Sequence, residues 1–359
     1  NFLDPGNELF HISHALTSAG QALKQTHHCI VTMRDREKTT IIGDNGGFQT
    51  ATQNITFDTD EKRKEILDWL EDRADIALAL DAPTSPLLER SNYVYRSTEE
   101  CLRVTLEHHK YFAEKRSKKS VLMLAVLHGN TEEAADHWYD RVKEFEFEGF
   151  AFAGIFRNSI YAIARRILIM HKEGRLEKVR WFHVLGCAEL HTGVMLTAIQ
   201  RAVNKHLQHD LRISYDTSGP FSNLGKGNIY TLPSFSRTQM TMGQSKVPNA
   251  YQYLNSDVAW PWPSPLGNYL RMRDVCVSTG NGSYQDQQAN HYIVHHNLAA
   301  LCFGIAQANR IFDAESLTGN HTIGVYQGEA VKTINQAFAK KSPAWLSTQK
   351  EIFARLPRG

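Results

Sequence analysis

The chain has 359 residues, of which 42% are hydrophobic and 22% charged, proportions that are ordinary for a globular enzyme. No apolar run is long enough to span a bilayer, so we expect no membrane association. The net charge of +2 is too small to indicate a nucleic-acid-binding protein by itself, although balanced totals can hide a basic face.

The cysteines indicate the redox environment. They are five in number, widely spread and without a CxxC pair: Cys29, Cys101, Cys187, Cys276 and Cys302. This pattern argues against a disulfide framework and favours a reducing compartment. Since the sequence has no signal-peptide pattern either, we expect a cytoplasmic protein.

The first strand that the sequence predicts clearly covers residues 39–42, a β-branched run. It leads to Asp44, then to two glycines that admit backbone conformations closed to other residues, and then to Phe48. Such a strand can deliver a carboxylate to the floor of a pocket, although an ordinary turn would have the same sequence. The apolar pieces before residue 39 stay unassigned.

Strand-like runs then alternate with amphipathic segments along the chain. The predicted helices begin at acid-rich, Ser- or Thr-capped positions or follow apolar periodicity, and they cover residues 60–73, 98–115, 131–147, 161–171 and 191–206. The further strands are predicted over residues 76–80, 121–127, 150–155, 181–185 and 211–215. Six strand-like runs in βα units indicate an α/β fold.

The strands read as continuous apolar runs, which is typical of a parallel sheet covered on both faces. The sequence has no GxGxxG or GxxxxGK[ST] loop, and this weakens a nucleotide-binding doubly wound fold. We therefore expect a (β/α)₈ TIM barrel, with its chemistry at the carboxyl ends of the strands.

After the sixth strand the pattern becomes rich in turns and aromatics, from residue 217 to 290, and we expect a long irregular insertion beside the site. A strongly apolar helix follows over residues 291–311. Residues 323–326 and 329–339 are expected to complete the barrel, so that residues 1–359 form one domain.

Three acids, Asp44, Asp81 and Asp216, follow separate predicted strands. They suit displacement at a sugar carbon, in which one carboxylate attacks and another transfers a proton. A divalent metal site is the alternative, but no second acid or histidine lies one or two residues from any of them.

These residues resemble a known family. Residues 44–49, Asp-Asn-Gly-Gly-Phe-Gln, resemble the Asp-Ser-Gly-Gly-Phe/Tyr-Gln motif of the tRNA-guanine transglycosylase superfamily, and residues 81–84 resemble its Asp-Glu-Cys-Thr. Weaker similarities, in the same order, are at residues 149–154, 185–186, 215–216, 223–227 and 296–298. The resemblance runs from about residue 40 to 310.

The resemblance implies a role for each matching residue. Asp216 would be the nucleophile that attacks C1′ of guanosine, and Asp44 the general acid/base. Asp81 would bind the purine edge, Phe48 and Leu185 would sandwich the base, and Gly186 would lie beside them. The backbone at Ala153, Gly154 and Ile155 would contact the flipped-out base. This chemistry needs no cofactor.

Two departures from the family matter. His128-Gly129 stands where the family has Gln-Gly, so His128 either takes over the base contact or lines the wall. The family's CxCxxC zinc motif is absent, which excludes its usual structural zinc site. An irregular zinc site from Cys276, His291, His296 and Cys302 is a weaker alternative to a helix that simply buries these side chains.

The loss of that zinc motif suggests a polymer other than tRNA. The chain looks most similar to the divergent relatives, encoded by phages and bacterial genomic islands, that exchange guanine in DNA for a 7-deazaguanine such as preQ0. A DNA-contacting surface is expected from Arg237, Lys246, Trp260, Trp262, Arg271 and Arg273, unless these residues pack the insertion.

Other functions stay open at this point. They are the same exchange on tRNA, a catalytically silent nucleic-acid-binding subunit, and a hydrolase of small glycosides. We expect the compartment to be the cytoplasm of a bacterium or of a phage-infected host. The sequence also leaves a homodimer open.

Overall fold

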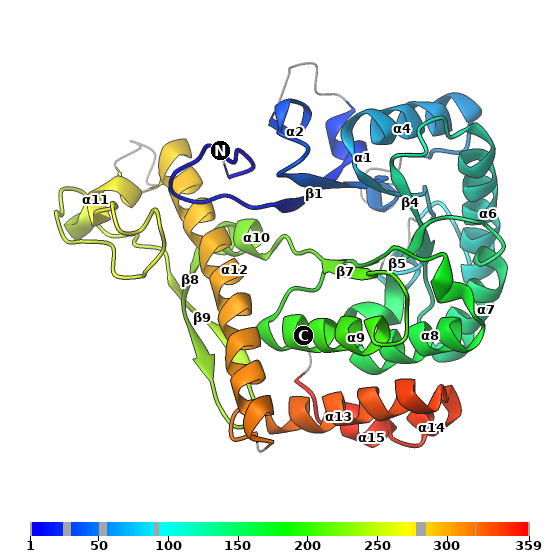
Figure 1. Ribbon diagram of the computed structural model, residues 1–359. Helices are drawn as coiled ribbons and strands as arrows, with labels where there is room; N and C mark the ends of the chain where they lie inside the picture. Colours follow the sequence, from blue (N-terminus) through cyan, green and yellow to red (C-terminus); the bar gives the residue numbers. More distant parts are fainter. Residues whose placement is uncertain are drawn as a thin grey trace.

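The computed structural model describes residues 2–23, 30–49, 56–89, 93–277, 285–319 and 321–357. Its main sheet is parallel and seven-stranded, with strand order β1-β2-β3-β4-β5-β6-β7. The strands are β1 (His14–Ser18), β2 (Thr40–Asp44), β3 (Ile76–Leu78), β4 (Leu122–Leu127), β5 (Gly149–Phe152), β6 (Trp181–Val184) and β7 (Arg212–Tyr215). The sheet curls into a half-barrel flanked by helices (Figure 1).

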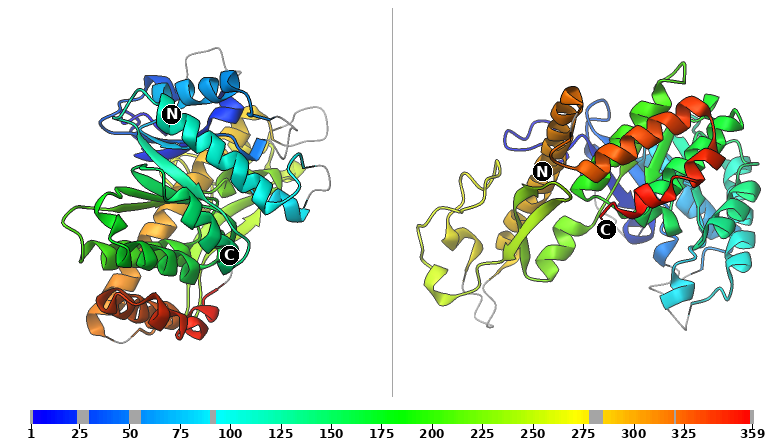
Figure 2. Two further views of the ribbon diagram at one scale, coloured as in Figure 1. Left: turned by 90° about the vertical axis from the view of Figure 1, so that its right-hand side faces the viewer. Right: turned by 90° about the horizontal axis from the view of Figure 1, so that it is seen from below.

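Helices cover the outside of the half-barrel (Figures 1 and 2). They are α4 (Asp60–Arg73), α6 (Thr98–Lys115), α7 (Glu132–Val142), α8 (Ile160–Lys172) and α9 (Leu190–Asn204), while the one-turn helices α1 (Ala19–Ala22), α2 (Ile30–Met33) and α5 (Pro86–Glu89) lie in connecting segments. The predicted caps are confirmed, because the side chain of Ser97 accepts from Glu100 N and that of Thr131 accepts from Ala134 N. Helix α7 ends at Val142, earlier than the predicted residue 147.

Both faces of the inner strands β3 to β6 are buried, as their continuous apolar sequences predict. In β4, Leu124 and Val126 face the interior of the half-barrel, in a cluster with Ile42, Leu78 and Trp181 of the other strands. Met123, Ala125 and Leu127 of the same strand join the larger cluster under the helices. In the inner strands β3 to β6, alternate residues therefore belong to two hydrophobic clusters.

After β7 the chain leaves the half-barrel and forms what we call the arm, residues 219–318, on one side of it (Figure 1). It comprises α10 (Gly219–Gly225), the antiparallel strands β8 (Asn228–Phe235) and β9 (Met240–Lys246), the 3₁₀ turn η3 (Tyr251–Tyr253), α11 (Met272–Val275) and the long α12 (Gln287–Thr318). The predicted insertion is thus a β-ribbon and a coil backed by a helix.

The C-terminal segment corrects one prediction. Residues 323–326 and 329–339 do not supply a strand: the chain forms α13 (Val325–Lys340), followed by α14 (Pro343–Ser347) and α15 (Lys350–Ala354). Gly324, in the left-handed region at φ 66°, precedes the first turn of α13. In the described residues the sheet accordingly has seven strands, without a pairing of β7 to β1.

The N-terminal strand β1 was not predicted. It pairs in parallel with β2, from His14 opposite Thr40 to Ser18 opposite Asp44. Its sequence, His-Ala-Leu-Thr-Ser, is only partly buried and carries few of the apolar residues that identify the inner strands. In the part of the chain that the structure describes, none of the helices combines the length and apolar character needed to cross a bilayer.

Candidate active site

Three strands of the half-barrel bring acids to one edge of the sheet. Asp44 is the last residue of β2, Asp81 follows β3 by three residues, and Asp216 directly follows β7. Because the strands are parallel, their carboxyl ends lie on the same side. The charges of Asp81 and Asp216 both act on Asp44, so the three carboxylates form one electrostatic unit.

The turn after β2 connects the first two acids. The side chain of Asn45 donates from Nδ2 to Ala79 O at 2.7 Å and to Asp81 Oδ1 at 2.8 Å, and its Oδ1 accepts from Gly47 N at 2.6 Å. A Cβ on Gly47 would lie 2.6 Å from the carbonyl oxygen of Asp81, which explains the glycine. The turn therefore fixes the orientation of Asp81.

The second oxygen of Asp81 pairs with His128, at 2.6 Å from Nε2. Burial alone would raise the pKa of Asp81, but the hydrogen bonds from His128 and Asn45 outweigh it and lower that pKa. Among the described residues, Nδ1 of His128 is buried without a hydrogen-bond partner. His128 thus supports Asp81 directly and keeps one ring nitrogen unsatisfied.

Asp216 is held by a different set of donors. Its Oδ1 accepts from Gly186 N at 2.9 Å and lies 3.2 Å from Nε2 of the fully buried His183. Burial would raise the pKa of Asp216, but His183, Gly186 and the Arg157 guanidinium together hold it below its usual range. Asp216 is consequently an ionised carboxylate at neutral pH.

Asp44 has the opposite electrostatic environment. Burial is the largest cause that raises its pKa, and the carboxylates of Asp81 and Asp216 raise it further. The nearby Ser18 hydroxyl and the Gly46 N–H act in the other direction, and the resulting pKa is about 6. Two acids whose pKa values are driven apart in this way can act as a nucleophile and a proton carrier.

This raised pKa predicts a pH-dependent cost in stability. In the unfolded chain Asp44 ionises near pH ~4, whereas in the folded protein it ionises at about pH 6. The unfolded state binds fewer protons between these values, so the free energy of unfolding falls as pH rises through them. Above this window the charge costs about 3 kcal/mol.

Asp44→Asn is therefore expected to raise the melting temperature by about 4 °C at pH 8, and not at pH 4. Thermal unfolding of both proteins across this range measures the difference. Asp210→Asn, at an exposed acid, is the matched control and should change little at either pH. An equal gain at pH 4 would contradict the electrostatic origin of the effect.

The residues expected to contact the base lie around the acids and differ in exposure and in hydrogen bonding. Phe48 is 48% exposed, and Leu185 is half-buried at the end of β6. The backbone N–H groups of Ala153 and Ile155 already donate to Leu127 O and Gly129 O, both at 2.9 Å. The side chains of Phe48 and Leu185 are thus accessible, whereas the backbone N–H groups of Ala153 and Ile155 are already hydrogen-bonded.

Gly154 is required by the close approach of neighbouring loops. It has φ 61°, and a Cβ there would lie 2.3 Å from Gly129 O. The loop after β5 is therefore packed against the loop after β4, beside His128. This contact explains the glycine without a ligand.

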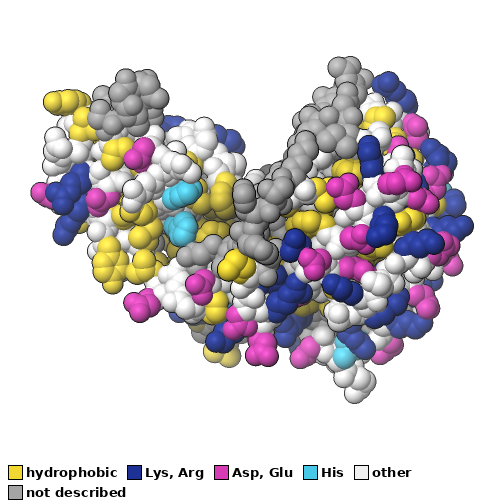
Figure 3. Space-filling model, turned by 90° about the horizontal axis from the view of Figure 1, so that it is seen from above, with side chains coloured by type: hydrophobic (Ala, Val, Ile, Leu, Met, Phe, Trp, Pro, Cys, Tyr) yellow, Lys and Arg dark blue, Asp and Glu magenta, His cyan; other side chains and the backbone are white. Residues whose placement is uncertain are grey.

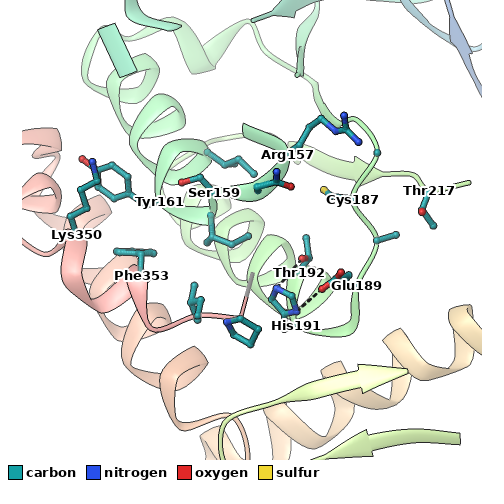
Figure 4. Close-up of a pocket in the computed structure, with 18 of the residues that line it drawn as sticks. Arg157, Ser159, Tyr161, Cys187, Glu189, His191, Thr192, Thr217, Lys350 and Phe353 are labelled. Carbon is teal, nitrogen blue, oxygen red and sulfur yellow. Dashed lines mark hydrogen bonds and ion pairs between the residues drawn. The ribbon is translucent and has the colours of Figure 1, made fainter. Parts of the chain in front are cut away.

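A cavity of about 350 Å³ adjoins the Asp216 side of the site (Figure 4). Gly186 and Thr217, which flank Asp216 in space, line one end, and the starts of α8 and α9 together with residues 350–357 form the walls. Asp44, Asp81 and Asp216 are not among its lining residues. The cavity, which we call the annex, therefore lies beside the three acids and does not contain them.

Burial changes the pKa values of one histidine and one acid in this cavity. Burial lowers the pKa of His191 to about 4 and raises that of Glu189, and these two side chains lie 3.3 Å apart (Figure 4). Arg157 and Lys350 are the cations in its wall, and Lys350 pairs with Glu132 outside it. Arg157 is the cation that also acts on Asp216.

The irregular zinc site, which the sequence left as a weaker alternative, is not assembled among the described residues. His296 is fully buried, with Nδ1 2.8 Å from Ser264 Oγ and Nε2 2.9 Å from Tyr230 O. Cys276 donates to Ala250 O, and His291 lies on the exposed side of α12, where Cys302 is partly buried. Within the described ranges, no three His, Cys, Asp or Glu side chains are grouped to hold a metal ion.

The expected nucleic-acid surface divides into core and surface residues. Trp260 is 5% exposed and packs edge-on against Trp262 and His296, so it belongs to the core of the arm. Arg237, Lys246 and Arg271 are exposed on the arm, and Arg273 pairs with Asp257.

Figure 3 shows the arm and the half-barrel as two lobes with a hollow between them, seen from above. In that view basic and acidic side chains are interspersed on the half-barrel lobe. The arm lobe likewise shows basic and acidic side chains together.

Several residues of the site were not predicted, above all His183, Ser214, Asn45 and Arg157. His183 had a detectable signal, because it is a histidine inside an otherwise apolar predicted strand, two positions before Leu185. Side chains two apart on a strand point to the same face. The sequence did not reveal that Asp216 would be its partner.

The comparisons with known proteins add no relative: no family model matches the chain, and no curated protein matches it significantly.

Proposed function

We propose that this protein is a base-exchange glycosyltransferase that replaces guanine in DNA with a 7-deazaguanine through a covalent intermediate on Asp216. The observation that carries the proposal is the electrostatic split between two neighbouring acids. Asp216 has a lowered pKa, and Asp44 has a pKa of about 6. A ready nucleophile next to a proton carrier is what displacement at a glycosidic carbon requires.

In the first step, an oxygen of Asp216 attacks C1′ and the bond from C1′ to guanine N9 breaks. The electron pair of that bond goes to the purine, which takes the proton of Asp44. In the second step, the ionised Asp44 removes the N9 proton of the incoming 7-deazaguanine, whose nitrogen attacks C1′ and displaces Asp216. Two displacements at C1′ retain its configuration.

Asp81 is assigned to the purine edge, because a carboxylate held ionised by His128 and Asn45 can accept from ring and amino N–H groups. Phe48 and Leu185 are assigned to the two faces of the base. A base can reach these residues only after it leaves the helical stack, so the enzyme must stabilise the flipped-out base. The annex beside Asp216 gives room for the attached sugar and phosphate, near Arg157.

The fold is compatible with this function without deciding it. The half-barrel has the strand order of a TIM-type (β/α) sheet, and we propose that it is a (β/α)₈ barrel relative whose arm takes the place of the last unit. The resemblance in residues 44–49 and 81–84 supports the roles assigned to Asp44 and Asp81.

The polymer is tested by labelled preQ0, supplied in parallel with duplex DNA, single-stranded DNA and unmodified tRNA. We expect label in DNA. Label in tRNA alone would overturn the choice of DNA and keep the chemistry. Label in no polymer would overturn the base-exchange function and favour a small glycoside or a silent binding role.

The exposed cations of the arm give a separate prediction about DNA. If Arg237 and Arg271 each contact a phosphate, the double alanine variant should bind DNA more weakly and reduce the slope of log K against log salt by about two. Fluorescence anisotropy at several salt concentrations measures the slope. Replacing Lys178 and Arg355, exposed cations of the half-barrel and the C-terminal helices, is the control. An unchanged slope would place the DNA elsewhere.

A further inference from the structure

Behind Asp216, the buried Trp181 and His183 and the half-buried Ser214 form a chain of hydrogen bonds. Trp181 Nε1 donates to Ser214 Oγ at 2.6 Å, Ser214 Oγ lies 2.8 Å from His183 Nδ1, and His183 Nε2 lies 3.2 Å from Asp216 Oδ1. Strands β6 and β7 supply all of it, since Trp181 is opposite Arg212 and His183 opposite Ser214 in their register. The sequence resemblance assigned no role to these three side chains.

The direction of this chain follows from the donors. The indole N–H of Trp181 can only donate, so it occupies one lone pair of Ser214. The single hydroxyl proton of Ser214 can then go to His183 Nδ1 at 2.8 Å or to Phe182 O at 3.4 Å. The shorter contact takes the proton. A ring nitrogen that accepts a hydrogen bond carries no proton, so the proton of His183 is on Nε2 and is donated to Asp216.

The two oxygens of Asp216 are therefore unequal. Oδ1 accepts hydrogen bonds from His183 Nε2 and Gly186 N, whereas in the described part of the chain no donor is hydrogen-bonded to Oδ2. An oxygen that holds two hydrogen bonds is a weaker nucleophile than one that holds none, and its position is fixed. The hydrogen bonds on Oδ1 also orient the plane of the carboxylate.

On the basis of the proposed function, we infer that His183 positions Asp216, the nucleophile. The Trp181–Ser214 pair holds it as a neutral imidazole with its proton on Nε2, where it fixes Oδ1 of Asp216 and leaves Oδ2 as the attacking oxygen. When Oδ2 bonds to C1′ and the purine departs, Oδ1 becomes the carbonyl oxygen of the ester. His183 keeps its proton throughout and acts through Asp216 alone.

Nitrogen-15 NMR of histidine-labelled protein tests the tautomer independently of activity. The protonated and unprotonated ring nitrogens of a neutral histidine resonate far apart, and the signals of His183 are those that His183→Asn removes or that Ser214→Ala shifts. We expect a proton on Nε2 alone in the wild type and a mixture of tautomers in Ser214→Ala. A proton on Nδ1, or on both nitrogens at neutral pH, would overturn the inference.

Kinetics test the positioning. His183→Asn should lower kcat about 100-fold, because a misdirected nucleophile loses its alignment, and should leave KM for DNA within about twofold. His171→Asn removes another buried imidazole, on α8, and should leave kcat unchanged, which separates positioning from lost stability. A rise in KM with unchanged kcat in His183→Asn would refute the role.

The two proposals fail in different ways. If wild-type protein exchanges no base but shows the Nε2 tautomer, the proposed function is wrong and the hydrogen-bond chain stands. If it exchanges bases and shows another tautomer, the chain is wrong and the function stands. Either variant alone assigns the wild-type signals of His183, so loss of one variant does not leave the question open.

Discussion

Asp216→Asn is expected to abolish base exchange, with a loss of at least about 10⁴-fold, because it removes the attacking group. The amide oxygen can still accept from His183 and Gly186, so the packing around residue 216 is retained. Release of labelled guanine from DNA measures the activity, and a gel under denaturing conditions detects the protein–DNA adduct. Both signals should disappear together.

Asp210→Asn, which changes an exposed acid six residues away, is the control and should keep both signals. Loss of the adduct with retained exchange would point to direct displacement by the incoming base, without an intermediate. Persistence of the adduct in Asp216→Asn would assign the nucleophile to another residue.

Asp44→Asn is expected to slow guanine release by about 10² to 10⁴, the usual contribution of a positioned general acid. The release rate of the wild type should also depend on pH, in a direction set by the pKa of Asp44. Asp44 has a pKa of about 6, so its protonated fraction, and with it the single-turnover release rate of the wild type, should fall about tenfold per pH unit above that value. The variant has no proton to lose, and its profile should be flat across this range.

A substrate with a better leaving group sharpens this test. A 7-methylguanine in DNA departs as a neutral base and needs no proton from the enzyme. Asp44→Asn should therefore lose much less rate on this substrate than on guanine. Equal losses on both substrates would mean that residue 44 acts by binding or by structure, and not as an acid.

Together with the stability prediction, these results would describe one trade-off at Asp44. The same raised pKa that makes the carboxyl a proton carrier near neutral pH lowers the free energy of unfolding above pH 6. Asp44→Asn should then be less active and more stable. This combination is common where a site needs a group in an unfavourable environment.

Much of the fold was predictable because its inner strands and long helices have strong patterns. Helices α4 and α6 occupy the predicted residues 60–73 and 98–115, and the six predicted strands correspond to β2–β7 within a few residues. Continuous apolar strands and capped helices carry this information locally. The α/β class and the parallel sheet follow from it.

The two ends of the sheet were less predictable, for physical reasons. Strand β1 is partly exposed and mixed in polarity, so its pairing with β2 decides its structure rather than its own sequence. Residues 323–326 form a short apolar run, which suits a strand or a buried helix equally, and the longer periodicity up to Lys340 prevails.

The residues of the site likewise include some that the sequence could predict and some that it could not. The acids could be predicted because each follows a strand in sequence, and parallel strands bring their carboxyl ends together. Their partners could not, because they come from neighbouring strands: His183 lies 33 residues before Asp216, and His128 lies 47 residues after Asp81. These partners hold the pKa values of Asp216 and Asp81 below their usual range.

The most direct measurement is the site of covalent attachment. Wild-type protein is incubated with guanine-containing DNA without an incoming base, the adduct is trapped by denaturation, and nuclease and protease digestion followed by mass spectrometry locates the added deoxyribose phosphate. The account predicts this mass on the side chain of Asp216. The same mass on another residue, or exchange of guanine with no protein-bound sugar, would contradict it.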